Sequence, residues 1–277
     1  MPSASTQEID DYDSLLVAQQ NVLGVVVPDE QRSDLLERIK PLLSTYKFDS
    51  LSSLAQGLHS GQAEKGHSGM ITNVLDVISQ RQSSWHLSAE LQTLLQNYVF
   101  AQLPESARIW VVGCGMGQPA YAVAMEALEY ERNSGDSKNF QIVATDISAE
   151  YIEHANSATY SELQLAGLRD SYRKLYTTFD ESKNEGQVKD KVRQLINFRR
   201  CDLKDDFHAL GEMDLIICPE VLYYYSNGVK ASMLQRFSQQ LKSGGIFIAG
   251  SNQAVTVFNN SMERVVHPAG TFYRQKS

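Results

Sequence analysis

The sequence predicts an α/β protein in which an N-terminal all-helical domain precedes a doubly wound sheet. Two observations carry this prediction. In the first hundred residues, apolar side chains recur at helical spacing, as in Leu35, Leu36, Ile39, Leu42 and Leu43. From residue 108 onward, short β-branched runs alternate with helix-like segments. That alternation is typical of a parallel sheet covered by helices on both faces.

Four segments of the first half show helical periodicity. The first holds the apolar residues just named and is expected to start near Pro28. The second runs from Leu51 to Leu58, with Asp49 as a candidate N-cap. The periodicity resumes over 71–78 and again over 87–98. This half carries no chemical motif of its own, which favours a helical cap or adaptor.

The second half supplies the expected sheet. Strands are predicted at 109–112, 140–145, 196–198, 213–218 and 246–249, and helices at 118–132 and 229–241. A polar stretch interrupts the alternation, and we interpret it as a small inserted subdomain at about residues 173–200. The expected organisation is therefore a helical domain over 1–95 and a sheet domain over 96–277.

Composition and charge exclude several classes of protein. The chain has 277 residues, 42% of them hydrophobic, so a packed core is expected. Its formal net charge of -8 argues against nucleic acid as the main partner, because such a partner requires a basic surface. The N-terminus lacks the features of a signal peptide, and no apolar run is long enough to span a bilayer. We expect a cytoplasmic protein without membrane insertion.

The cysteines and histidines do not indicate a metal site. Cys114, Cys201 and Cys218 have no metal-ligand spacing, and the six histidines are scattered. We therefore expect no bound metal and interpret the cysteines as free thiols, which is typical of a reducing compartment.

Three closely spaced glycines, Gly113, Gly115 and Gly117, follow the first predicted strand and open a predicted helix. Glycines let the backbone turn sharply and let a ligand approach the main chain. In a doubly wound sheet this turn lies at the edge where ligands bind. A dinucleotide fingerprint requires glycine at position 118, where this chain has Gln118. The loop fits an adenosyl ligand without a pyrophosphate better, and a glycine turn without a ligand is the alternative.

An acidic residue follows each of the next two predicted strands. Asp146, with Ile147 beside it, suits hydrogen bonds from both hydroxyls of a ribose. The alternative for Asp146 is an N-cap, a role for which Ser148 competes. Asp202 suits an adenine amino group, with Leu203 packed on the ring, and the alternative is a surface turn. Signals at three successive strand ends together predict a site for an adenosyl cofactor.

With these segments in order, the chain resembles the CheR family of chemotaxis-receptor methyltransferases over nearly its whole length. The segments that carry the resemblance are IWVVGCGMGQPAYAVAM, FQIVATDISAEYIEHANSATYSELQLAG, INFRRCDL, MDLIICPEVLYYYSN and LKSGGIFIAGSNQ. The resemblance implies a Rossmann-like, S-adenosylmethionine-dependent methyltransferase domain. It also implies a helical domain ahead of that domain and a small β-subdomain in the insertion.

The resemblance further implies a reaction and its partners. Members of the family transfer a methyl group from S-adenosyl-L-methionine to receptor glutamate carboxylates, leaving S-adenosyl-L-homocysteine. The expected acceptor is therefore a protein, such as the cytoplasmic domain of a chemoreceptor, and we expect a monomer. A carboxylate is already a nucleophile near neutral pH. The reaction therefore needs no strong general base, and none is recognisable in the sequence.

The chain departs from the family pattern where the family holds its cofactor. Gln118 replaces a glutamate, His86 replaces an arginine, and Glu220 replaces an asparagine. Asp202 also replaces an asparagine, and it remains suited to the adenine contact. Tyr224 keeps the family's tyrosine, and the alternative for it is packing within a tyrosine cluster. The resemblance implies that His86 and Tyr224 lie at the reacting end and that Gln118 and Glu220 contact the cofactor.

Three functions are compatible with these residues. The first is a divergent, active methyltransferase that modifies a protein. The second is a catalytically inactive CheR-like protein that keeps the fold as a binding or scaffold module in signalling. The third is a small-molecule methyltransferase, which shares the fold and requires a concave acceptor pocket. The resemblance favours the first.

Overall fold

A computed structural model describes residues 13–18, 32–59, 70, 73–74, 77, 84–219, 221–250 and 261–276. The chain forms two compact units, one of residues 1–80 with 222–231 and the other of residues 81–221 with 232–277. Residues 84–95 belong to the unit that holds the sheet, although the sequence analysis assigned them to the helical domain.

The first unit is helical where it is described. Helices α2 (Arg32–Tyr46) and α3 (Leu51–His59) bury most of the apolar residues that the periodicity singled out, and Leu36 and Leu43 are half-buried. The cap of α3 is Ser50, whose hydroxyl accepts from the Ser53 N–H at 3.1 Å, so the prediction of Asp49 as the cap was wrong. The expected start near Pro28 and most of 71–78 lie outside the described residues.

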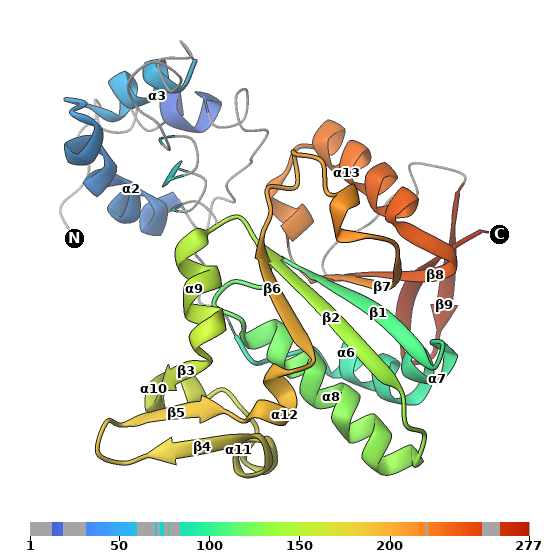
Figure 1. The fold of residues 1–277 in the computed structure, drawn as a ribbon. Helices are drawn as coiled ribbons and strands as arrows, with labels where there is room; N and C mark the ends of the chain where they lie inside the picture. The colour runs from blue at the N-terminus through green and yellow to red at the C-terminus, as the bar shows by residue number, and fades with distance from the viewer. Residues whose placement is uncertain are drawn as a thin grey trace. The chain divides into compact units, whose positions relative to one another are not determined.

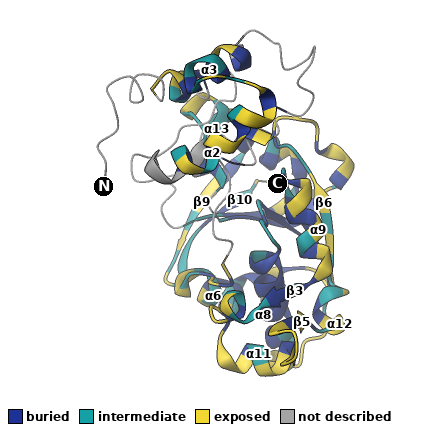
Figure 2. Ribbon diagram, turned by 90° about the vertical axis from the view of Figure 1, so that its left-hand side faces the viewer, coloured by how far each residue is buried: buried dark blue, intermediate teal, exposed yellow. Residues whose placement is uncertain are grey.

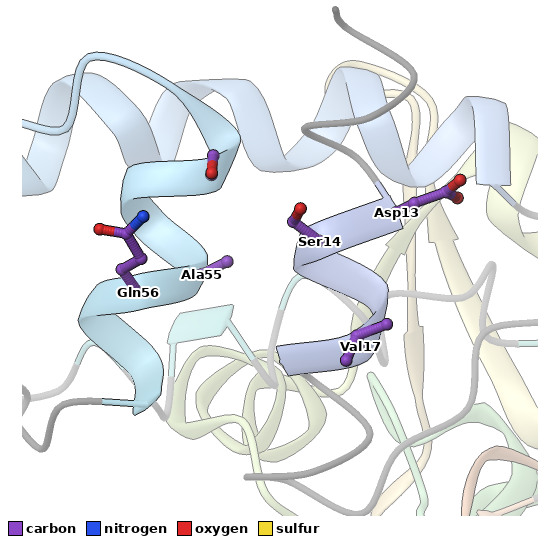
Figure 3. A pocket seen from close by; sticks show the side chains of 6 residues that line it. Asp13, Ser14, Val17, Ala55 and Gln56 are labelled. Atoms are coloured by element: carbon purple, nitrogen blue, oxygen red, sulfur yellow. The ribbon is translucent and has the colours of Figure 1, made fainter.

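A small open pocket lies between α3 and the helical segment 13–18 of this unit, as Figure 3 shows. Its lining residues are Asp13, Ser14, Val17, Ser52, Ala55 and Gln56. The lining is mixed in polarity and holds no cluster of titratable groups, so it presents no catalytic chemistry among these residues.

The second unit is built on a seven-stranded sheet of order β6-β2-β1-β7-β8-β10-β9, shown in Figure 1. Five strands are parallel: β1 (Ser106–Val112), β2 (Asn139–Asp146), β6 (Ile196–Arg200), β7 (Met213–Cys218) and β8 (Leu241–Ala249). All five were predicted. The antiparallel strands β9 (Met262–His267) and β10 (Gly270–Gln275) were not. The α/β fold class is confirmed.

Both faces of the sheet are covered because alternate strand side chains point to opposite faces. Trp110 of β1 packs with Phe207 and with Phe237 of α13 (Asn227–Gln240), with ring centroids 5.0 and 5.3 Å away. Its neighbours Ile109 and Val111 belong to the core cluster on the other face, together with α8 (Gln118–Ser134). These side chains are fully buried, so the sheet is a rigid platform for the loops at its edges.

The remaining helices of this unit extend the cover. Among them are α6 (Ala89–Leu94), the π-helical turn η3 (Leu95–Val99), α7 (Phe100–Gln102) and α9 (Ala149–Ser157). Figure 2 shows the buried sheet and helix faces against the exposed outer surface. None of the helices in the described part of the chain is long and apolar enough to cross a membrane.

A second, antiparallel sheet is inserted between α9 and β6. Its order is β3-β5-β4, formed by β3 (Thr159–Ser161), β4 (Thr177–Asp180) and β5 (Glu185–Val188). Short helices accompany it: α10 (Glu162–Leu165), α11 (Asp170–Tyr176) and α12 (Asp190–Arg193). This small sheet begins at residue 159, earlier than the expected bound near 173. Residues 196–200 join the main sheet as β6.

Candidate active site

The carboxyl ends of β1, β2 and β6 meet at one edge of the main sheet. In the pairing register Val112 lies opposite Thr145, and Asp146 lies opposite Arg200. Two backbone bonds continue this pairing past the strands: Cys114 N–H to the Thr145 carbonyl and Cys201 N–H to the Asp146 carbonyl, both at 2.9 Å. The three predicted signals therefore lie side by side at what we call the carboxyl edge.

The loop over 113–117, called the glycine loop here, adopts a backbone that glycine suits best. Gly113, Gly115 and Gly117 have φ values of 67°, 52° and 100°, in the left-handed region. A Cβ atom on Gly117 would lie 2.9 Å from Ala155 Cβ, and one on Gly113 would overlap Val221. Helix α8 starts directly after this loop, so its unpaired backbone N–H groups lie beside it.

Asp146 braces the glycine loop from the end of β2. One carboxylate oxygen accepts from the Gly115 N–H at 2.8 Å and the other from the Ser148 N–H at 3.1 Å. The Ile147 N–H also acts on this carboxylate, and because a carboxylate has about four acceptor sites, part of its capacity remains free. Ser148, not Asp146, is the side-chain cap of α9, because its hydroxyl accepts from the Tyr151 N–H.

The charge of Asp146 is not neutralised by a neighbour. Among the ion pairs of the described residues, none involves Asp146. Burial raises the pKa of its carboxyl above the ordinary value, although the backbone N–H donors of Ser148 and Gly115 act in the opposite direction. Because Asp146 is half-buried, keeps free acceptor sites and has no ion-pair partner among the described residues, its carboxylate can accept hydrogen bonds from the hydroxyls of a ligand.

Gln118 supplies a second free acceptor at the start of α8. The residue is 2% exposed, and within the described part of the chain its Oε1 atom is buried without a hydrogen-bond partner. Buried polar atoms are normally satisfied, so an exception beside a glycine loop indicates a partner other than the described residues. A ligand that carries both an ammonium group and a ribose fits this oxygen together with Asp146.

Asp202 and Leu203 follow β6 on the other side of Asp146. Asp202 is half-buried, and one carboxylate oxygen accepts from the Lys204 N–H at 2.9 Å, which leaves the second oxygen available. Leu203 is buried, and its carbonyl accepts from Arg236 at 2.6 Å. The turn is therefore anchored to α13, with an acid and an apolar side chain adjacent to each other.

Other predicted residues are placed differently. Ile147 is half-buried and its carbonyl accepts from the Arg200 side chain at 3.0 Å. The side chain of His86 is exposed, and its backbone N–H donates to the Ser84 hydroxyl at 3.0 Å. Glu220 lies outside the described residues, as does the side chain of Tyr224. The structure therefore brings Gly113–Gln118, Asp146 and Asp202 together, and the roles of His86, Glu220 and Tyr224 stay predictions.

Sequence reasoning missed an aromatic group beneath the loop. Tyr160 of β3 donates its hydroxyl hydrogen to the Met116 carbonyl at 2.7 Å. Trp85 packs edge-on against Tyr160 with centroids 4.9 Å apart and donates to the Gln164 carbonyl at 2.9 Å. The available signal was an isolated tryptophan beside His86 in a polar segment, and that signal does not identify its distant partners.

The cysteine of the glycine loop is buried in surroundings that disfavour a thiolate. Cys114 is fully buried, and burial, with the nearby Asp146 charge, raises the pKa of its thiol well above the ordinary value. None of Cys114, Cys201 and Cys218 forms a disulfide in the described part of the chain, which confirms their interpretation as thiols. The chemistry of the edge therefore rests on its acceptors and its backbone.

The comparisons with known proteins agree with this geometry. Residues 82–270 match the family model described as CheR methyltransferase, SAM binding domain. A chemotaxis protein methyltransferase of Vibrio parahaemolyticus is 29% identical over 279 residues, covering 98% of each chain. Chemotaxis protein methyltransferase 1 of Pseudomonas aeruginosa is also 29% identical, covering 96% of this chain and 98% of that one.

A solved TehB-like SAM-dependent methyltransferase from Corynebacterium glutamicum covers 69% of this chain and 89% of its own. Its identity of 13% and TM-score of 0.41 add no weight to the assignment. The family model alone spans more than half of the sequence, and the matched region contains β1, β2 and β6, the strands that form the carboxyl edge. The chain belongs to the CheR methyltransferase family and is an S-adenosylmethionine-dependent methyltransferase.

Proposed function

We propose that this protein methylates glutamate side chains in the cytoplasmic domain of a chemoreceptor or a similar signalling protein. The proposal adds the acceptor, the reaction product S-adenosyl-L-homocysteine, a monomeric state and a cytoplasmic location to the family assignment. The observation that carries it is the carboxyl edge, where the Asp146 carboxylate has no ion-pair partner among the described residues and lies next to three glycines with positive φ. The names of the relatives support a chemotaxis protein as the acceptor.

The proposed cofactor contacts follow the acceptors of this edge. Gly113, Gly115 and Gly117 lie under the methionyl and ribose parts, where the absence of side chains allows close approach. Asp146, with Ile147 beside it, accepts from the ribose hydroxyls. The buried oxygen of Gln118 accepts from the ammonium group.

At the far end of the proposed site, Asp202 accepts from the adenine amino group and Leu203 packs on the ring. Glu220 is proposed as a further cofactor contact.

The chemistry requires alignment more than acid–base catalysis. Bound S-adenosylmethionine supplies a methyl group on a positively charged sulfur. An acceptor carboxylate oxygen forms the new C–O bond as the C–S bond breaks, and no proton is transferred. The acceptor is ionised near neutral pH. The protein's task is therefore to hold the two groups in line and to exclude water.

His86 and Tyr224 are the proposed residues at the reacting end. An aromatic ring near a sulfonium stabilises it by cation–π attraction, which suits Tyr224. A neutral imidazole at His86 can hydrogen-bond an acceptor carboxylate without a permanent charge. Because His86 makes and breaks no bond, we expect His86→Ala to lower kcat by about tenfold or less, with little change in cofactor affinity. Tyr224→Phe keeps the aromatic ring and should change kcat by less than about twofold.

The test measures the binding of S-adenosyl-L-homocysteine and then the stability in base of the bond between the acceptor and the transferred methyl group. Calorimetric titration with S-adenosyl-L-homocysteine measures the cofactor site of the full chain. Incubation with labelled S-adenosylmethionine and a purified chemoreceptor cytoplasmic domain then measures transfer. A carboxyl methyl ester releases methanol in mild base, whereas methylated nitrogen does not. We expect saturable binding and base-labile label.

Either of two results would contradict the proposal. Absence of binding at high ligand concentration would exclude enzymatic activity and favour a catalytically inactive CheR-like binding module. Saturable binding with base-stable label, or with label only on small molecules, would keep the cofactor site and replace the acceptor.

A further inference from the structure

The small sheet contacts the glycine loop through one loop residue, Met116. Tyr160, in β3, donates its hydroxyl hydrogen to the Met116 carbonyl at 2.7 Å. Gln164, in α10, points its amide nitrogen at the Met116 sulfur, 3.8 Å away. These partners are 44 and 48 residues from Met116 in the sequence. An inserted element thus contacts the backbone and the side chain of the same loop residue.

Tyr160 is itself held in place on all sides. The residue is 1% exposed, and its ring meets Trp85 edge-on at a centroid distance of 4.9 Å and 72°. Trp85 is fixed in turn by its hydrogen bond to the Gln164 carbonyl. A Cβ atom on Gly117 would lie 3.0 Å from the Tyr160 hydroxyl oxygen, so this hydroxyl lies directly against the loop. Burial raises the Tyr160 pKa, which keeps the hydroxyl protonated as a donor.

The glycine loop needs such a restraint. Glycine populates positive and negative φ about equally, so a segment with three glycines has many alternative backbone states. The affinity for a ligand that requires one of those states is reduced in proportion to the fraction of time that the loop spends in that state. Asp146 restrains the loop at the Gly115 N–H, on the strand side. The Met116 carbonyl is the contact on the small-sheet side.

We propose that Tyr160 is a positioning residue of the cofactor site, which holds the glycine loop in its ligand-binding conformation through the Met116 carbonyl. Gln164 assists through the Met116 sulfur. This inference rests on the proposed function, in which the loop receives S-adenosylmethionine. It gives the small sheet a second role besides its own fold, because displacement of β3 would lower cofactor affinity.

The chain provides a matched control in Tyr121. That residue is also 1% exposed, and burial also raises its pKa. Its hydroxyl donates to the Ala155 carbonyl at 2.8 Å, in α9, and not to the Met116 carbonyl. Tyr121→Phe keeps the ring, which packs against the Tyr160 ring at a centroid distance of 6.3 Å. Tyr160→Phe and Tyr121→Phe therefore remove equivalent buried hydrogen bonds and should lower the melting temperature alike. Only the first should weaken the cofactor site.

The experiment is calorimetric titration of the full chain with S-adenosyl-L-homocysteine, for wild type, Tyr160→Phe and Tyr121→Phe. We expect the Kd of Tyr160→Phe to rise by roughly tenfold, because a buried carbonyl loses its donor. The Kd of Tyr121→Phe should stay within about twofold of wild type. In a transfer assay, Tyr160→Phe should raise KM for S-adenosylmethionine and leave kcat at saturation unchanged.

Two outcomes separate this inference from the proposed function. If wild type binds and Tyr160→Phe binds equally well, the positioning role is overturned and the proposed function stands. If wild type does not bind, the proposed function fails and this inference fails with it.

Should Tyr160→Phe not fold, Gln164→Glu tests the same link. That change keeps the oxygen that accepts from the Ser161 N–H at 2.9 Å but removes the donor to Met116. We expect a Kd increase of about threefold, since a sulfur is a weak acceptor. An unchanged Kd would overturn the role of the small sheet.

Discussion

Two aspartates near opposite edges of the main sheet, the half-buried Asp146 and the buried Asp214, have different surroundings. Asp146, at the carboxyl edge, accepts from two backbone N–H groups and has no ion-pair partner among the described residues. Asp214 lies near the amino end of β7, accepts from the Arg108 N–H at 2.8 Å and forms an ion pair with Lys242 at 2.8 Å. A neutralised carboxylate stabilises its neighbours, whereas one with spare acceptors is available to a ligand.

The same contrast extends to the glycines of α8. Gly117 precedes this helix at the carboxyl edge, and Gly135 ends it, with φ values of 100° and 70°. A Cβ on Gly117 would meet Ala155 and Tyr160, but a Cβ on Gly135 would have no atom within 4 Å. Gly117, at the carboxyl edge, thus allows Ala155 and Tyr160 to approach the backbone closely. Gly135, at the opposite edge, only ends a helix.

The largest expected effect tests the aspartates directly. Asp146→Ala should weaken S-adenosyl-L-homocysteine binding on the order of a hundredfold, because charge-assisted bonds to the ribose and the brace of Gly115 are lost together. Asp214→Ala should instead lower the free energy of unfolding by on the order of 2 kcal/mol and leave the Kd unchanged. Calorimetry and urea unfolding measure the two quantities. Equal effects of both variants on the Kd would contradict the assignment of ligand binding to Asp146 and of stability to Asp214.

The glycine pair is expected to give the next largest effect. Gly117→Ala should lower the free energy of unfolding by on the order of 2–4 kcal/mol, since left-handed backbone strain adds to a steric overlap. Gly135→Ala meets only the backbone strain and should lower it by about 1 kcal/mol. Thermal unfolding of both variants checks the difference. Similar losses would mean that the contacts of Gly117 with Ala155 and Tyr160 are easily relieved.

Lowering the pH should weaken the binding of S-adenosyl-L-homocysteine several-fold, because the carboxyl of Asp146 becomes protonated. Because the folded pKa of Asp146 is raised above the ordinary 3.8, this carboxyl is protonated in the folded protein at a pH where the unfolded chain is still ionised. Ligand hydroxyls favour the ionised form, so affinity is full above the raised pKa and is lost as pH falls through it. For the unliganded protein the sign is opposite, and this group favours folding as pH falls toward 3.8.

Titration with S-adenosyl-L-homocysteine from neutral pH downward, in buffers of different ionisation heat, measures the linked proton. Asp214→Asn should show the same slope as wild type, because Asp214 does not contact the proposed ligand. A flat profile in wild type would mean that ionised Asp146 is not the acceptor.

The smallest expected effect lies at the far end of the carboxyl edge. Asp202→Ala should weaken S-adenosyl-L-homocysteine binding by about three- to tenfold, because one hydrogen bond to the adenine amino group is lost. The inosyl analogue carries an oxygen in place of that amino group. Wild type should discriminate against the analogue, and Asp202→Ala should bind both ligands alike. Retained discrimination in the variant would assign adenine recognition to another group.

Local patterns in the sequence predicted most of the sheet unit. The five parallel strands, α8 and the glycine loop follow from short β-branched runs, helical periodicity and glycine spacing, which are properties of neighbouring residues. The order in which an acid follows each of two strands also predicted that Asp146 and Asp202 would meet at one edge. The hairpin of β9 and β10 was missed because its alternation is interrupted by exposed and half-buried side chains.

The sequence by itself determined the fold class, the family and the place of the glycine loop, because each depends on residues close together in the chain. Only the tertiary structure decided which aspartate is neutralised, since Lys242 lies 28 residues from Asp214. It likewise decided that Tyr160 supports Met116, a contact between residues 44 apart. Such contacts depend on how strands and insertions pack, and a side chain's spare hydrogen-bonding capacity is known only after all its neighbours are placed.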